Sequence, residues 1–148
     1  MKIAVIVLIA FACLQFPLLA IADTPLAELK AQAVAEVLKS LIKDAAGTKI
    51  VVLNLSSKDV TRLKHYFADQ TVTLISDNDL DYYRDPHKSQ ADQEMLFLDI
   101  KIEEITPTSA TILGGDKHVG LSGETDIFRL KRTEGKWIIL TRRPYEVS

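Results

Sequence analysis

Residues 94–105 read EMLFLDIKIEEI, and apolar side chains recur at every second position through most of this stretch. A period of two is typical of a β-strand that buries one face and exposes the other. Leucines and isoleucines lie on the expected buried face, while Asp99, Lys101 and Glu103 lie on the other. We therefore predict an antiparallel sheet with one covered side in this half of the chain.

Three further strand segments follow. The turn at residues 106–108 leads into a strand at 109–113, and strands at 124–132 and 136–143 are joined by a hairpin turn that contains Gly135. Glycines at positions 114, 115, 120 and 123 predict a bend or bulge around residues 116–122. We expect these four strands to form a C-terminal meander.

The preceding half of the chain has a helical period. Thr24 is a candidate cap, Pro25 suits a first helical position, and apolar residues then recur at three- and four-residue spacing until Gly47. A buried strand at 49–55, a second helix capped by Ser56 and Ser57, and a short strand at 71–75 are expected next. The predicted fold class is α+β, with a long N-terminal helix packed on a curved antiparallel sheet.

The first 22 residues have the parts of an export signal. Lys2 precedes an apolar run, and the segment ends in Ala20-Ile21-Ala22, a small-x-small exit before Asp23. We expect residues 1–22 to be a signal peptide and 23–148 to be a single domain, periplasmic or secreted, with no membrane contact after cleavage. A retained membrane anchor is the alternative.

Charge and cysteine content exclude several classes of protein. The chain has 18 basic and 20 acidic residues and no basic run, which argues against nucleic-acid binding. The single cysteine, Cys13, cannot form an internal disulfide framework or a multi-cysteine zinc site, and it lies in the segment expected to be removed.

The C-terminal half contains a pattern made of Gly114-Gly115, the run from Gly120 to Thr125, and Gly135-Lys136-Trp137 with the isoleucines after it. In this pattern the chain resembles small exported bacterial proteins of cystatin-like or NTF2-like fold. The resemblance implies a long helix gripped by a curved antiparallel sheet, and it implies no catalytic residues. The expected mature chain lacks the disulfides of true cystatins.

One long connection is a candidate interface. Residues 76–93 join two predicted strands, and long loops are often functional. The loop opens with alternating acidic residues, but Tyr82 and Lys88 stand where a calcium-binding EF-hand loop needs Gly and Glu. We take a partner loop formed by Asp79, Asp81, Tyr82, Tyr83 and Arg84 as the candidate, with tyrosines folded back onto the sheet as the alternative.

A second candidate is a polar pocket lined by Asp99, Asp126 and Arg129, although the alternation also allows these residues to face water. The three histidines have no metal-ligand spacing, and no metal site or cofactor is predicted. We favour a non-enzymatic exported domain that binds a protein partner, or a small ligand between helix and sheet. The alternative is an NTF2-like hydrolase or isomerase using Asp126 or Asp99 as a base. The oligomeric state stays open.

Overall fold

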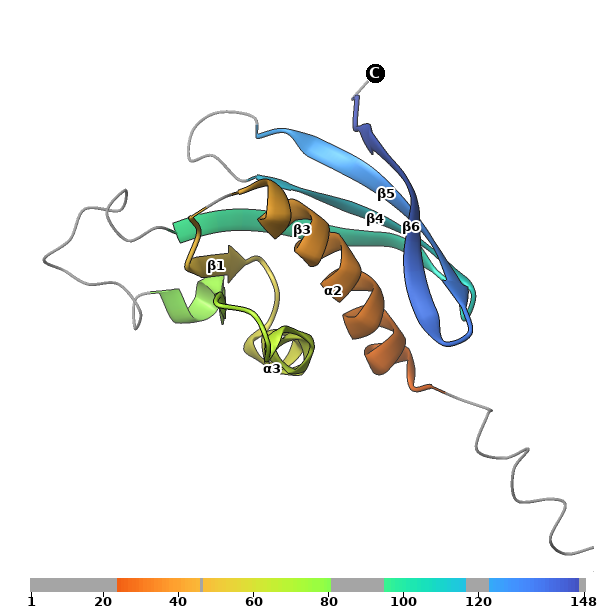
Figure 1. Ribbon diagram of the computed structural model, residues 1–148, viewed down its shortest axis with the longest axis horizontal. Helices are drawn as coiled ribbons and strands as arrows, with labels where there is room; N and C mark the ends of the chain where they lie inside the picture. Colours follow the sequence, from red (N-terminus) through yellow and green to blue (C-terminus); the bar gives the residue numbers. More distant parts are fainter. Residues whose placement is uncertain (1–23, 46, 81–94, 117–122, 147–148) are drawn as a thin grey trace, which may run out of the picture.

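The computed structural model describes residues 24–45, 47–80, 95–116 and 123–146 (Figure 1). These residues form one six-stranded sheet and two α-helices, with two short 3₁₀ segments, so the predicted α+β class is confirmed. The α-helices and strands are α2 (Leu26–Asp44), β1 (Ile50–Leu53), α3 (Ser57–Lys64), β2 (Thr73–Ser76), β3 (Met95–Ile105), β4 (Ser109–Asp116), β5 (Thr125–Thr133) and β6 (Lys136–Pro144).

The sheet is mixed rather than antiparallel, which corrects the predicted sheet type. It has six strands, whereas the predicted meander has four. Its strand order is β2-β1-β3-β4-β5-β6. Strands β3 to β6 run antiparallel in chain order, but β1 pairs in parallel with both β2 and β3. The parallel pairing of β1 and β2 follows from the helix between them, because a crossover through α3 returns the chain in the same direction.

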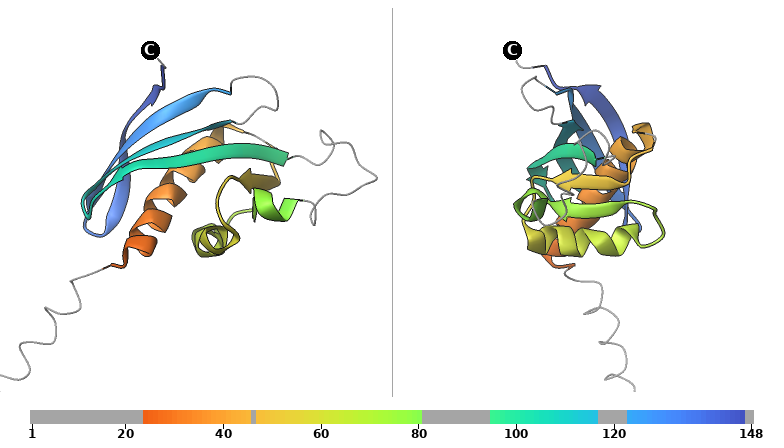
Figure 2. Two further views of the ribbon diagram at one scale, coloured as in Figure 1. Left: turned by 180° about the vertical axis from the view of Figure 1, so that it is seen from behind. Right: turned by 90° about the vertical axis from the view of Figure 1, so that its left-hand side faces the viewer.

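Helix α2 lies against one face of this sheet. In Figure 1 and in the left view of Figure 2, strands β3 to β6 curve around it, and α3 lies beside it near β1 and β2. The buried side of α2 includes Val37 and Leu38, which join Ile112 and Phe128 in the hydrophobic core. Gly114 of β4 lies under this side of the helix, where an added Cβ would meet Val37 Cγ1 at 3.1 Å. The absence of a side chain at Gly114 lets helix and sheet approach closely.

The helix starts differ from each other in their caps. Helix α2 begins at Leu26 with Pro25 in the cap position and no side-chain cap, so Thr24 does not cap it as predicted. Instead, the Thr24 hydroxyl accepts a hydrogen bond from Arg132 Nη2 of β5 at 3.2 Å. Helix α3 is capped by Ser56, whose Oγ accepts from the Asp59 N–H at 3.2 Å.

Two glycines lie inside β4 rather than in a bend. Gly114 and Gly115 pair with Asp126 and Thr125 of β5. A Cβ on Gly115 would stand 2.0 Å from the carbonyl oxygen of Glu124, so this position admits no side chain without moving backbone. The close approach of the neighbouring strand is the reason for Gly115, whereas residues 117–122 of the predicted bend lie outside the described residues, so the bend stays a prediction.

Among the residues described, no helix has both the length and the apolar character needed to cross a bilayer.

Candidate functional site

An open groove lies between the N-terminal half of α2, helix α3 and the middle of β3. Its volume is about 540 Å³, within the range usual for small-ligand pockets. Helix α2 contributes Leu26, Ala27, Lys30, Ala31 and Val34 to its lining. The other side is formed by Leu55, Asp59, Leu63 and residues 100–102 of β3. The lining is mainly aliphatic, so the groove suits an apolar occupant.

The groove exists because β1 is short. β1 pairs with β3 only over Met95–Leu98, after which the chain turns away into α3. Asn54, the residue after β1, continues the pairing for one more step: its N–H donates to the Leu98 carbonyl at 3.4 Å. Its side chain also accepts from the Ile100 N–H at 2.8 Å and donates to the Ile100 carbonyl at 3.3 Å. Beyond Ile100, no described strand lies beside β3 on this edge.

Among the described residues, no backbone pairs with β3 beyond Ile100 on the β1 side. Backbone N–H and C=O groups of alternate residues point to the same side of a strand, so those of Ile102 point to the β1 side, like those of Ile100. Ile102 lies opposite Ile112 of β4, and a bulge at Glu103 follows it. The Ile102 side chain also lines the groove. Backbone groups able to form hydrogen bonds and an apolar surface therefore meet at one place.

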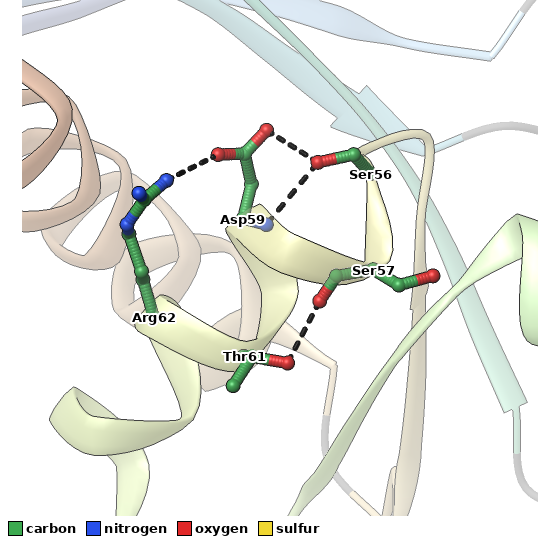
Figure 3. Close-up of polar contacts among 5 residues, drawn as sticks. All are labelled: Ser56, Ser57, Asp59, Thr61 and Arg62. Atoms are coloured by element: carbon green, nitrogen blue, oxygen red, sulfur yellow. Dashed lines mark hydrogen bonds and ion pairs between the residues drawn. The ribbon is translucent and has the colours of Figure 1, made fainter.

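The rim of the groove carries three charged residues, Asp59, Lys101 and Lys30, which differ in their ion-pair partners. The Asp59 carboxylate contacts Ser56 Oγ at 2.7 Å and Arg62 Nη1 at 3.2 Å, as Figure 3 shows. Lys101 forms an ion pair with Glu103 at 2.7 Å, and the hydrogen bond and charge of Glu103 raise the pKa of Lys101. Within the described ranges, no ion pair is found for the exposed Lys30. The uncompensated charge at the rim is positive.

The three residues of the predicted polar pocket do not lie together. Asp126 is opposite Gly114 and shares the helix-facing side of β5 with Phe128. Asp99 is opposite Gly115, and Arg129 is opposite Thr141, on the other face of the sheet. The pocket prediction is corrected accordingly, because positions 126 and 129 are an odd number of residues apart and must point to opposite sides of a regular strand.

Asp126 is instead part of an ion-pair cluster that the sequence reasoning missed. Arg142 Nε contacts Asp126 Oδ2 at 2.5 Å, and Arg142 Nη1 contacts Asp44 Oδ2 at 2.5 Å and Ser40 Oγ at 3.3 Å. The guanidinium also lies 5.3 Å from the centre of the Phe128 ring. Because Asp44 and Ser40 belong to α2, the cluster ties the C-terminal part of the helix to β5 and β6.

The charge of Arg142 is constant near neutral pH. Burial lowers the pKa of Arg142, but hydrogen bonds to Asp126 and Asp44 and the charges of these carboxylates raise it, and the net shift is upward. Arg142 therefore remains a cation throughout the physiological range. The cluster is a fixed connection rather than a proton-transfer site, since each carboxylate already has a cationic partner.

The predicted partner loop is described only at its first residue. Asp79 lies in a 3₁₀ turn and accepts a hydrogen bond from Ser57 Oγ at 2.8 Å. Asp81, Tyr82, Tyr83 and Arg84 lie outside the described residues, so this interface stays a prediction.

One of the three histidines can be placed. His65 follows α3, and its ring is perpendicular to that of Tyr66 with the centroids 5.9 Å apart, whereas His87 and His118 fall outside the described ranges. Within those ranges, no three His, Cys, Asp or Glu side chains gather as metal ligands would.

Comparisons of the chain with protein families, with curated proteins and with solved structures give no match.

Proposed function

We propose that this protein is an exported binding domain whose binding site is the groove between α2, α3 and β3. The observation that carries the proposal is an apolar groove with an exposed apolar mouth. Leu26, at the start of α2, lines the groove and is 56 % exposed, and Ala27 beside it is also exposed. An apolar occupant would remove these side chains from water, which is the main driving force for such binding.

The enzyme alternative has less support from the same residues. A general base must reach the proton it removes, and a carboxylate that is paired with a permanent cation is a weaker base. Asp126 is bound by Arg142, and Asp99 faces away from the helix side of the sheet. The carboxylate that lines the groove, Asp59, is occupied by Ser56 and Arg62. These arrangements favour binding over acid–base catalysis.

Export is proposed from the sequence of residues 1–22. A charged start, an apolar centre and the Ala20-Ile21-Ala22 exit are the features that export machinery and signal peptidase require. Cleavage after Ala22 would leave every described helix and strand in the mature chain, since α2 begins at Leu26. The proposed location is the periplasm or the exterior.

The fold proposal keeps the cystatin-like or NTF2-like resemblance. The position of α2 in the hollow of strands β3 to β6 supports it, as does the hairpin at Gly135. The parallel strands β1 and β2 depart from a purely antiparallel sheet. The groove opens beside β3 just beyond Leu98, where the parallel pairing of β1 with β3 ends.

The test uses the neutral apolar dye N-phenyl-1-naphthylamine, whose fluorescence rises in apolar surroundings. We expect the mature chain to bind the dye and the variant Ala27→Trp to lose most of this binding, because the indole would fill the mouth of the groove. Lys43→Trp, on the same helix but outside the groove lining, is the matched control and should bind as wild type does. Equal binding by both variants, or none by wild type, would exclude the groove as the site.

A further inference from the structure

The backbone N–H and C=O groups at the open edge of β3 need hydrogen-bond partners, which an apolar small molecule does not provide. The N–H and C=O groups of Ile102 point into the row that β1 occupies further along, and a row of unpaired backbone groups is a template for another strand. A ligand without hydrogen-bonding groups would cover the Ile102 side chain but leave these groups unpaired and partly removed from water. Such groups are costly when they lose water without gaining a partner.

An extended polypeptide meets both requirements at once. Its backbone can pair with the edge, and every second side chain can turn toward the helix side of the sheet, where Ala31, Val34 and Leu63 line the groove. Asn54 already shows how the edge is used, because its side chain supplies one acceptor and one donor to Ile100 as a neighbouring strand would. The next backbone groups along this edge belong to Ile102, which lines the groove.

We propose that the natural occupant of the groove is an extended segment of a partner protein, which adds to β3 beside Ile102 in the row of β1. The inference rests on the proposed function and specifies its ligand class. The segment presents small or aliphatic side chains to the groove at alternate positions, and an acidic side chain near Lys30, the rim cation without an ion pair in the described part of the chain.

The outer edges of the sheet are less suited to the same role. β2 is four residues long, and β6 has a bulge at Leu140 that interrupts regular pairing. Ile138 and Leu140 of β6 are 53 % and 61 % exposed, but neither lines the groove. The β3 edge joins open backbone groups to an apolar groove, although the bulge at Glu103 limits pairing to a short segment.

The first test compares two variants at one position. The probe is a 12-residue peptide selected on the purified mature chain from a displayed random library, and dissociation constants are measured by fluorescence anisotropy. Ile102→Ala shortens the side chain and keeps the N–H, whereas Ile102→Pro also removes the N–H, which faces away from β4 and so takes no part in the internal ladder. We expect the peptide to bind Ile102→Pro about tenfold more weakly than Ile102→Ala, since the peptide carbonyl loses its donor. Equal affinities would overturn strand addition.

The second test needs no variant of the protein and holds if Ile102→Pro fails to fold. Single N-methyl groups are placed along the selected peptide, and binding to the wild-type chain is measured. Strand addition predicts loss of affinity at every second peptide position over a short segment, because alternate N–H groups face β3. Uniform tolerance, or loss without alternation, contradicts it.

The dye N-phenyl-1-naphthylamine separates this inference from the proposed function. If peptide binding is insensitive to Ile102→Pro and to N-methylation while the dye still binds and is displaced by Ala27→Trp, strand addition is wrong and the groove remains a binding site. If neither dye nor peptide depends on Ala27, the proposed function fails together with the inference.

Discussion

Asn54 binds Ile100 through both of the backbone groups that Ile100 turns toward the row of β1. The Ile100 N–H donates to Asn54 Oδ1 at 2.8 Å, and Asn54 Nδ2 donates to the Ile100 carbonyl at 3.3 Å. The short Asn54 side chain carries a donor and an acceptor on separate atoms, so it closes one step of the β3 edge and leaves the next open. The boundary between the paired sheet and the groove is therefore set by one side chain.

Replacing Asn54 by Ala should uncover the backbone of Ile100. We expect a loss of about 1–2 kcal/mol of unfolding free energy, because two backbone groups lose their partners. We also expect faster exchange of the Ile100 amide hydrogen, measured by NMR. The exposed Asn78, whose N–H rather than side chain bonds Ser76 Oγ, supplies the control variant Asn78→Ala. An unchanged Ile100 exchange rate would refute the role of Asn54.

Arg142 should contribute to stability through its contacts with α2 and β5. Arg142→Ala removes the ion pairs with Asp44 and Asp126 and the contact with the Phe128 ring, and we expect it to cost about 1–2 kcal/mol in urea unfolding. Arg143 is exposed and lies next in sequence, opposite Ile127, so Arg143→Ala should change stability by less than about 0.5 kcal/mol. Similar losses in both variants would contradict the assignment.

The stability difference between wild type and Arg142→Ala should not change between pH 8 and pH 10. The pKa of Arg142 is raised above its already strongly basic usual value, so its contribution is complete below that value and is lost only as the pH rises through the still higher folded-state pKa. Urea unfolding of both proteins at the two pH values checks this. A difference that shrinks by pH 10 would mean that a group of lower pKa controls the cluster.

The two adjacent glycines of β4 should differ in their tolerance of alanine. A Cβ on Gly115 would stand 2.0 Å from the Glu124 carbonyl oxygen, so Gly115→Ala has to move the backbone of the next strand. A Cβ on Gly114 would meet the ends of the Ile100 and Val37 side chains at 3.0 and 3.1 Å, and these can shift. We expect a loss of more than about 3 kcal/mol for Gly115→Ala and about 1 kcal/mol for Gly114→Ala, from thermal or urea unfolding. Equal losses would contradict the close backbone approach.

The sequence alone predicts which side chains of a regular strand face the core, because odd- and even-numbered residues point to opposite faces. The period of two at residues 94–105 predicts the faces of β3, because Leu98 and Ile100 are buried while Asp99 and Lys101 are exposed. The same rule applied to β5 would have separated Asp126 from Arg129. The polar pocket prediction is therefore wrong, since two residues three positions apart in a regular strand without a bulge do not share a face.

Other features depend on contacts that local patterns do not contain. Ile139 and Arg142 both face the helix although they are three residues apart, because Leu140 is an extra residue in a bulge opposite Arg129 and Leu130. The position of that bulge is not visible in the run of apolar residues from Trp137 to Leu140. Similarly, the apolar run Ile50–Leu53 predicts a buried strand but neither its direction nor its neighbours. The groove begins where the pairing of β1 with β3 ends, so it could not be predicted without knowing the direction and the neighbours of β1.

Lys30 should favour anionic ligands in the groove. Lys30→Gln removes the rim cation that has no ion pair among the described residues, and we expect the affinity for the anionic dye 8-anilino-1-naphthalenesulfonate to fall about threefold at low salt. Binding of the neutral N-phenyl-1-naphthylamine should stay the same. Lys43→Gln, on α2 but outside the groove lining, is the control and should leave the affinity for both dyes unchanged. Equal loss of both dyes in Lys30→Gln would indicate a structural effect instead of a charge effect.

Processing after Ala22 should follow the size of the side chains at the exit. Small residues are required at the first and third positions before the cut, while the position between them is tolerant, so Ala20→Tyr and Ala22→Tyr should retain the leader. Ile21→Tyr introduces the same side chain at the tolerant position and should be cleaved normally. Mass spectrometry of the purified protein from a bacterial host should give a wild-type chain that begins at Asp23. Detection of the full-length chain in the membrane fraction for wild type and Ile21→Tyr alike would support the retained anchor instead, because no cleavage after Ala22 would then take place.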